Sequence, residues 1–104
     1  MMPNDYKLTL AAKNDVKAIW QYTVEKWGEQ QAEKYIDQLE KQFKDLVKTP
    51  NLGRARPDIH IGYRSLPEGK HIIFYRVADD LIEIIGIPHA SMDVETHLLP
   101  QTED

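Results

Sequence analysis

The stretch of residues 53–88 contains the longest runs of β-branched and aromatic side chains in the chain. Two runs within it, residues 71–77 (HIIFYRV) and 81–87 (LIEIIGI), are rich in β-branched and aromatic side chains, as buried strands are. Residues 67–69 (PEG) precede the first run and residues 79–80 (DD) separate the two, and both are typical turn sequences. The pattern therefore predicts that both runs are central strands of a sheet.

A third run, residues 59–66 (IHIGYRSL), alternates more regularly between apolar and polar side chains. Strict alternation is typical of a strand with one buried face and one face toward solvent. Together with the two central strands, it predicts two consecutive β-hairpins in the C-terminal half of the protein.

The N-terminal half has a different periodicity. Residues 6–10 (YKLTL) alternate and predict a first strand, and from about Ala11 the spacing becomes helical. The first helical stripe consists of Val16, Trp20, Thr23 and Trp27, with Ile19 and Val24 beside it. Gly28 follows at the usual place for a helix end, and Pro50 ends the second helical pattern. That second stripe consists of Ala32, Ile36, Leu39, Phe43 and Leu46, with Tyr35 and Val47 beside it.

Two helices with almost no linker must fold back antiparallel, and neither can bury its apolar stripe alone. We therefore expect an α+β fold of order β-α-α-β-β-β, with a helical hairpin on one face of a mostly antiparallel sheet. Residues 51–58 (NLGRARPD) cross from the helices to the sheet. Residues 89–98 (HASMDVETHL) are expected to form a short last helix, and residues 100–104 a frayed acidic tail. The whole chain, residues 1–104, is predicted to be one domain.

Composition narrows the class of protein. Hydrophobic residues make up 41% of the chain and charged residues 29%, which is ordinary for a soluble globular domain. No apolar run is long enough to span a membrane and the N-terminus lacks an apolar signal core, so we expect a cytoplasmic protein. The absence of cysteine excludes disulfides and thiolate metal sites. The net charge of −4 argues against a protein that coats nucleic acid, although it leaves a local basic patch open.

All four arginines lie in the stretch that is predicted to form the sheet. Arg offers a planar fork suited to carboxylate or phosphate. If residues 79–80 form a two-residue loop, Arg76 faces Glu83 as a cross-strand ion pair. Arg64 has no such evident partner, which makes it the better candidate for recognition. Arg54 and Arg56, on a loop, either pair with the acidic second helix or contact another molecule, and their loop position favours contact with another molecule.

Two other constellations support only a weaker interpretation. His89, Asp93 and His97 recur every four residues and would share a helical face as metal ligands, but no fourth ligand is evident and a solvated helix end explains them equally well. We predict neither a metal nor a cofactor. Aromatic residues at helical spacing are more consistent with a core than with a platform for stacking bases; they are Trp20, Trp27, Tyr35 and Phe43.

One enzymatic hypothesis remains. A metal-free ribonuclease needs a general base or acid near neutral pKa and cations for the scissile phosphate. His89 with Arg64 and Arg76 would supply such a set if the strands bring them together. The acidic chain, with no cluster of lysines beside these arginines, counts against it.

Several segments resemble one protein family. The stretch LTLAAKNDVKAIWQYTVEKWG, the segment PNLGRARPDI, the strand sequence GYRSLPEGKHIIFYR and the close IIGIPHASMDVETHL are similar to the ParE toxins of bacterial type II toxin-antitoxin modules. The likeness spans residues 6–99. Its most specific pieces are GRxRPD, GYRS, HIIFYR and HxxMD. ParE belongs to the RelE/ParE superfamily, whose β-α-α-β-β-β fold agrees with the architecture expected here.

The resemblance implies a toxin that poisons DNA gyrase by protein-protein binding, without catalysis of its own, until a ParD-like antitoxin neutralises it in a hetero-oligomer. Such modules stabilise plasmids or chromosomal segments. Neither membrane binding nor sequence-specific DNA binding by the toxin alone is expected. The RelE branch instead cleaves messenger RNA on the ribosome, which is the alternative function with Arg64, Arg76 and His89. A third possibility is a toxin-like fold that acts only as a repressor or scaffold.

A helical hairpin can bind an amphipathic helix in its groove, and a sheet edge can bind an added strand. An antitoxin segment that is unfolded when free could therefore bind both the hairpin and the sheet edge. We expect the hairpin to bind the antitoxin through Trp20, Trp27, Tyr35 and Leu39. The arginine-rich sheet face and residues 88–99 are expected to recognise gyrase, through Arg54, Arg56, Arg64, His89 and Met92.

Overall fold

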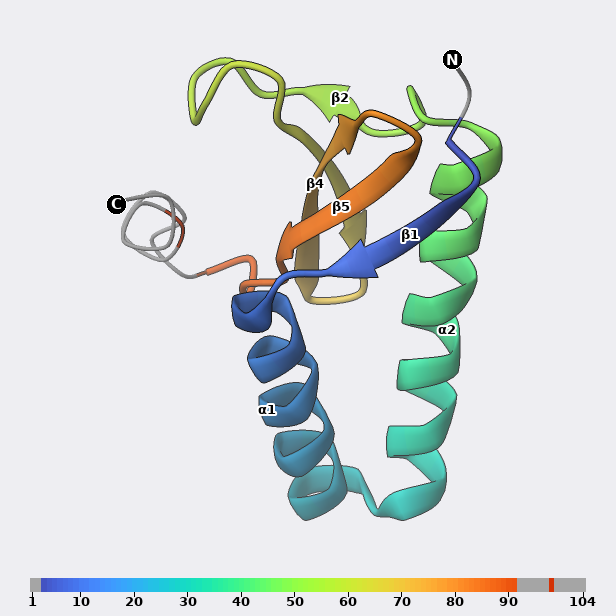
Figure 1. The fold of residues 1–104 in the computed structure, drawn as a ribbon. Coiled ribbons are helices and arrows are strands. Elements are labelled where there is room, and N and C mark those ends of the chain that lie inside the picture. The colour runs from blue at the N-terminus through green and yellow to red at the C-terminus, as the bar shows by residue number, and fades with distance from the viewer. Residues whose placement is uncertain (1–2, 92–97, 99–104) are drawn as a thin grey trace.

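The computed structural model describes residues 3–91 and Leu98 of the chain, and Figure 1 shows its arrangement. Two helices precede most of a five-stranded sheet, which confirms the α+β fold and the position of the helical hairpin. The elements in chain order are β1 (Asp5–Leu8), α1 (Leu10–Trp27), α2 (Glu29–Lys48), β2 (Arg54–Ala55), β3 (Arg64–Glu68), β4 (His71–Ala78) and β5 (Leu81–Gly86).

The sheet has the strand order β1-β5-β4-β3-β2. β1 pairs with β5 in parallel and the other neighbours are antiparallel. β4 and β5 therefore lie inside the sheet, as their composition predicts. The two-residue loop at Asp79 and Asp80 is also confirmed, because Ala78 pairs with Leu81 and Arg76 with Glu83.

The strand predicted over residues 59–66 is wrong at its start. Residues 57–62 form turns instead, in which the amides of Ile59 and His60 both bond the carbonyl of Arg56. The strand begins at Arg64 and continues through Pro67, so the turn before β4 is Gly69 and Lys70. The alternation of apolar and polar residues predicted too early a start for this strand. Ile61, which fits the alternation, lies in the loop before the strand and is 85% exposed. The crossing segment, residues 51–58, also contains the short strand β2, which the hydrophobic pattern of the sequence did not predict.

The helix boundaries agree closely with the periodicity. α1 begins one residue earlier than expected, because the Thr9 hydroxyl caps it by accepting a hydrogen bond from the Ala12 amide at 3.0 Å. Gly28 joins the two helices with a φ of 94°, a conformation that other residues adopt only with strain. α2 ends at Lys48, just before Pro50. No helix among the described residues is long and apolar enough to cross a bilayer.

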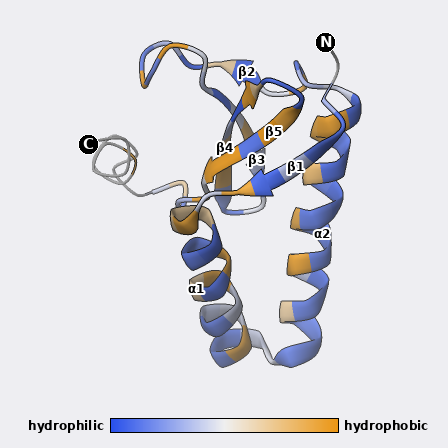
Figure 2. Cartoon of the chain, viewed as in Figure 1, coloured by the Kyte–Doolittle hydropathy of each residue, from blue (hydrophilic) through white to orange (hydrophobic). Residues whose placement is uncertain are grey.

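The main core lies between the helices and one face of the sheet. The α2 residues Leu39, Phe43 and Leu46 pack there against Ile73 and Ile84 of the central strands. Figure 2 shows the hydrophobic segments of α2 turned toward the sheet and its outer side hydrophilic. Burial of these side chains removes apolar surface from water, which is the dominant stabilising term.

The opposite face of the sheet, called here the open face, is not bare. Phe74 and Ile85 on this face form a second buried cluster with Tyr63 and with Leu98 from the C-terminal segment. The central strands are therefore buried on both sides. The rest of residues 89–98, where a last helix is expected, and the tail at 100–104 fall mostly outside the described residues.

The predicted core role of the α1 aromatic residues is wrong at the end of the helix. Among the residues of the first stripe, Val16 packs against the core and Trp20 is half-buried, whereas Trp27 is 67% exposed. The fully buried α1 residues are Ala12 and Ile19. The sheet covers the start of α1 and not its last turns, as Figure 1 shows, so the apolar side chains near Trp27 have no cover from the described part of this chain.

A buried tyrosine fixes the crossing from α2 to the sheet. The Tyr75 hydroxyl donates to the carbonyl of Pro50 at 2.7 Å and accepts from the amide of Gly53 at 2.8 Å. A Cβ atom at Gly53 would lie 2.6 Å from the Ser65 carbonyl and 2.8 Å from the Tyr75 ring. Only glycine therefore allows the crossing segment to approach β3 and β4 this closely.

We predict that Gly53→Ala destabilises the protein by about 1–3 kcal/mol, because the added methyl group overpacks a site bounded by backbone. Urea unfolding followed by circular dichroism measures the change. Asn51→Ala, on an exposed side chain of the same segment, is the control and should change stability by less than about 0.5 kcal/mol. Equal stability of Gly53→Ala and the parent chain would contradict the close approach.

Candidate functional site

Two cavities mark the described surface. The hairpin groove, of about 590 Å³, lies between the last turns of α1, the first turns of α2 and the turn that joins β3 to β4. It is lined by Tyr22, Thr23, Lys26, Trp27, Gln31, Tyr35, Gly69, Lys70, His71 and His89. In Figure 1 the β3–β4 turn projects toward the space between the two helices. The volume of this groove falls within the size range of ordinary ligand sites.

Tyr35 and His71 form the polar wall of the hairpin groove. The Tyr35 hydroxyl donates to the carbonyl of Glu68 at 2.7 Å and contacts Nδ1 of His71 at 2.9 Å. A carbonyl only accepts, so the single hydroxyl proton is used there and His71 Nδ1 must be the donor in the second bond. Burial raises the pKa of Tyr35 to about 12, with a smaller contribution from the Glu68 carboxylate, so the phenol stays protonated.

His89 joins this wall from beyond the end of β5. Its backbone forms a bridge with His71, and the two rings meet edge to face with centroids 5.3 Å apart. His89 Nδ1 accepts the backbone N–H of Ser91 at 3.1 Å. Burial lowers the pKa of His71, and the nearby His89 lowers it further. The pair therefore presents two imidazoles whose inner nitrogens are already bonded.

The rim of the hairpin groove is aromatic and basic. Tyr22 is 57% exposed and Trp27 67%, and the ammonium of Lys26 lies 5.8 Å from the centre of the Tyr22 ring. Lys70 is exposed on the opposite side. None of the described lining residues is acidic. Exposed aromatic side chains beside a groove are typical of protein interfaces.

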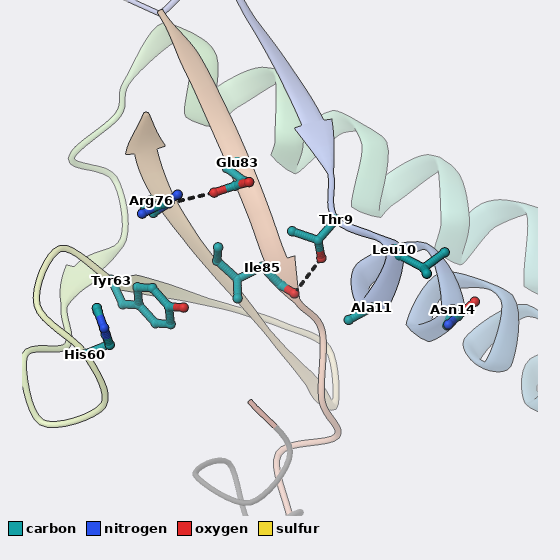
Figure 3. A pocket seen from close by; sticks show the side chains of 9 residues that line it. All are labelled: Thr9, Leu10, Ala11, Asn14, His60, Tyr63, Arg76, Glu83 and Ile85. Atoms are coloured by element: carbon teal, nitrogen blue, oxygen red, sulfur yellow. Dashed lines mark hydrogen bonds and ion pairs between the residues drawn. The ribbon is translucent and has the colours of Figure 1, made fainter. Parts of the chain in front are cut away.

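The open-face pocket, of about 670 Å³, lies on the other side of the sheet and is drawn in Figure 3. It is lined by Thr9, Leu10, Ala11, Asn14, His60, Tyr63, Arg76, Glu83 and Ile85. The Thr9 hydroxyl donates to the carbonyl of Ile85 at 2.9 Å, which ties the start of α1 to β5. The rings of His60 and Tyr63 contact each other in a tilted arrangement, with centroids 4.9 Å apart.

The ion pair predicted for Arg76 is confirmed. Its Nε lies 2.6 Å from Oε1 of Glu83, and this hydrogen bond raises the pKa of Arg76. Figure 3 shows the pair spanning the two central strands on the open face. Because Glu83 already satisfies it, Arg76 is a poor candidate for binding another anion.

Arg56 also has partners, though not on α2. Its guanidinium bonds Asp58 at 3.0 Å and the Ser65 hydroxyl at 3.3 Å, and it lies over the Phe74 ring at 5.4 Å. Arg54 pairs with Ser65 through the backbone, and its exposed side chain has no hydrogen bond or ion pair within residues 3–91. Arg54 is thus the arginine most available to another molecule.

The expectation that Arg64 lacks a partner is wrong. Its Nε donates to the carbonyl of Gly53 at 2.8 Å, and a terminal nitrogen lies 3.4 Å from the carbonyl of Asn51. Arg64 pairs with Tyr75 across the sheet, so it shares the helix-covered face and not the open face. Residue spacing does not predict hydrogen bonds to backbone carbonyls of a distant loop, so these two partners of Arg64 were not predicted from the sequence.

The set considered for a ribonuclease is not assembled. His89 lines the hairpin groove beside His71, whereas Arg76 lines the open-face pocket. Arg64 lies next to Tyr75, four residues along β4 from His71. At about 3.3 Å per residue along the strand, the backbone at Arg64 lies roughly 13 Å from the level of His71. The groups found together with His89 are His71 and Lys70, which no sequence motif singles out.

The predicted antitoxin-binding residues divide into two groups. Trp27 and Tyr35 line the hairpin groove, while Trp20 is half-buried outside the lining. Leu39 is only 1% exposed and belongs to the main core, so its predicted surface role is wrong. A leucine in the apolar stripe of a helix is compatible with burial in the core as well as with a binding surface, so its position in the sequence did not decide between the two.

The remaining candidates lie largely beyond the described part of the chain. Met92, Asp93 and His97 are not among residues 3–91 and Leu98. Within those described residues, no group of three or more metal-ligating side chains is close enough to hold an ion.

Comparison with known proteins places this geometry in a family. The family described as ParE toxin of type II toxin-antitoxin system, parDE, matches residues 6–94. Toxin ParE1 of Mycobacterium tuberculosis is 37% identical over 98 residues, covering 93% of this chain and 100% of the relative. Toxin ParE1 of Caulobacter vibrioides is 36% identical over 93 residues, covering 89% of this chain and 96% of the relative.

A solved structure agrees with this assignment. It belongs to the chromosomal ParDE TA system from P. aeruginosa and superposes with a TM-score of 0.73 at 27% identity, covering 86% of this chain and 98% of that chain. The family match extends from β1 through the central strands to the segment after β5, and it includes both the helical hairpin and the open face. The chain therefore belongs to the ParE toxin family of type II toxin-antitoxin systems.

Proposed function

We propose that this protein inhibits DNA gyrase by direct binding, without catalysis of its own, and that a ParD-like antitoxin neutralises it in a hetero-oligomer in the cytoplasm. Membership of the ParE family supports the toxin role, and the P. aeruginosa neighbour belongs to a ParDE system, which supports the antitoxin role of a ParD-like partner. The separation of Arg64 and Arg76 from His89 argues against the ribonuclease alternative.

The observation that carries the antitoxin half of the proposal is the uncovered apolar end of α1. Tyr22 and Trp27 are both more than half exposed beside a groove whose floor includes Tyr35. Large aromatic side chains left in water are costly unless a partner covers them, and a helical hairpin is suited to receive an amphipathic segment. The hairpin groove is thus the proposed antitoxin site.

Gyrase recognition is assigned to the opposite side of the molecule. Arg54 is exposed and forms no hydrogen bond or ion pair among the described side chains, although the pKa of Asp58 is lowered by the hydrogen bond from Arg56 and, to a smaller extent, by the charge of Arg54. Arg56 is held in place by Asp58 and Phe74. Ile61, 85% exposed, lies on the loop between them and β3. Arginine is one of the residue types enriched in interface hot spots. Two separate surfaces allow target and antitoxin to be tested separately.

We predict that the purified protein stops supercoiling by purified gyrase and that linear, cleaved DNA accumulates, because a bound toxin traps the enzyme with broken strands. Agarose-gel supercoiling and cleavage assays measure both effects. Addition of a purified ParD-like antitoxin should restore supercoiling. Unimpaired supercoiling, together with degraded messenger RNA on expression, would favour the ribonuclease alternative.

Trp27→Ala should weaken antitoxin binding by about tenfold or more, because truncation of an aromatic anchor typically costs about 2 kcal/mol or more at an interface. Isothermal titration calorimetry with the purified antitoxin measures the loss. Ile61→Ala removes another exposed apolar side chain, which lies outside the groove, and should leave this affinity unchanged. An unaffected Trp27→Ala would remove the hairpin groove as the antitoxin site.

Arg54→Glu should reduce gyrase inhibition by about tenfold while leaving antitoxin affinity intact, because charge reversal at an exposed recognition residue acts on one interface only. The concentration needed for half-maximal inhibition of supercoiling is the readout. Lys44→Glu, an exposed charge reversal on α2, is the matched control. Equal loss in both variants would indicate a general effect of charge and not recognition by Arg54.

A further inference from the structure

The hairpin groove has a charge character opposite to that of the protein. The chain carries a net charge of −4, yet the groove is lined by two lysines and two histidines and, among the described residues, by no Asp or Glu. The bases are Lys26, Lys70, His71 and His89. A basic groove on an acidic protein selects an anionic ligand by charge complementarity.

The hydrogen bonds determine which nitrogen of each imidazole remains for a ligand. His71 must donate from Nδ1 to the Tyr35 hydroxyl, because that hydroxyl gives its own proton to the Glu68 carbonyl. When neutral, His71 therefore carries no proton on Nε2. His89 accepts the Ser91 N–H at Nδ1, so its proton is on Nε2. His89 can thus donate to a ligand at once, whereas His71 donates only after it gains a proton.

The acidic groups around His71 are already engaged. The Glu68 carboxylate, on β3, accepts a hydrogen bond from Gln42 at 2.8 Å and does not line the groove. The Asp15 carboxylate, on α1, accepts a hydrogen bond from the amide of Ile87 at 2.8 Å and favours the charged form of His71, with a smaller effect on the pKa than burial or His89. Tyr35 on α2 stays neutral, and Lys70 precedes His71 in the turn. No ion pair of His71 is present within residues 3–91, and Asp15 is the one carboxylate there whose charge favours the protonated ring.

We propose that the end of the hairpin groove at His71 and His89 is a carboxylate-binding subsite, filled by an acidic side chain of the antitoxin segment that occupies the groove. The subsite rests on the proposed function for its occupant. The carboxylate accepts a hydrogen bond from Nε2 of His89, and a second from Nε2 of His71 once that ring is protonated. Trp27 and Tyr22 at the rim take a neighbouring apolar side chain of the same segment.

Proton uptake follows from this arrangement. Burial and His89 lower the pKa of His71 in the free protein, so the ring is mostly neutral near pH 7. A bound carboxylate favours the charged ring and raises that pKa in the complex. Affinity must then increase as the pH falls toward the free-protein pKa and decrease as the pH rises through the pKa of the complex. A rise of one pKa unit corresponds to about a tenfold gain in affinity.

The decisive experiment measures antitoxin affinity by calorimetry at about pH 5.5 and about pH 7.5, where Asp and Glu side chains remain ionised. The parent protein should bind about tenfold more tightly at the lower pH. His71→Asn places an amide nitrogen near the position of Nδ1 and keeps a donor for Tyr35, but it cannot titrate, so its affinity should change less with pH than that of the parent. His89→Asn should bind more weakly at both pH values, because the donor at Nε2 is lost.

His60→Asn is the matched control, because His60 is exposed in the open-face pocket and does not line the groove. It should retain the parent pH dependence. Equal affinity of the parent at both pH values, or an unchanged pH dependence in His71→Asn, overturns the subsite. If His71→Asn does not fold, NMR titration of the parent decides, because the pKa of His71 must be higher in the complex than in the free protein.

Failure of the proposed function gives a different result. If the antitoxin does not bind at any pH, the antitoxin assignment is wrong, and sodium acetate then serves as the probe for the subsite alone. Acetate, compared with chloride at equal ionic strength, should raise the NMR-measured pKa of His71 and shift the His89 ring signals. No change in either histidine overturns the subsite.

Discussion

Burial of β4 and β5 on both faces is the constraint on which the rest of the molecule depends. On one side Ile73 and Ile84 pack against Leu39 and Phe43, and on the other Phe74 and Ile85 pack against Tyr63. A sheet only five strands wide offers limited apolar area, and it is covered by the start of α1 and the inner side of α2. The last turns of α1 extend past the sheet. Their aromatic side chains consequently remain at the surface, where a partner can cover them.

Electrostatics separates the two surfaces further. Three of the four arginines are engaged within the chain: Arg56 with Asp58, Arg64 with the Gly53 carbonyl and Arg76 with Glu83. These contacts hold the crossing segment and the central strands in register. The bases that remain for recognition are Arg54 on the open face, and the lysines and histidines of the hairpin groove. An acidic protein can therefore still present two basic contact sites.

Much of the fold could be predicted because its signals are local. β-branched runs identified β4 and β5, and the two-residue loop at Asp79 gave the pairing of Arg76 with Glu83. The features that were missed depend on tertiary contacts. Strand β2 is too short to show a period, and the bonds of Tyr75 to Pro50 and Gly53 join residues more than 20 positions apart. Likewise, an apolar stripe on α1 does not reveal how far along the helix the sheet extends, so the stripe alone does not distinguish the exposed Trp27 from the core residues.

The candidate site was less predictable than the fold for the same reason. Trp27 and Tyr35, both named from the sequence as antitoxin contacts, line the hairpin groove, but His71 and Lys70 join them only because a turn of the sheet reaches the helices. The central claim is that the hairpin groove and the open face are separate binding surfaces, the first for the antitoxin. Hydrogen-exchange mass spectrometry of the protein alone and with its antitoxin tests this claim most directly. We expect slower exchange in residues 19–35 and 68–72 and unchanged exchange in residues 56–63; slower exchange confined to residues 56–63 would contradict it.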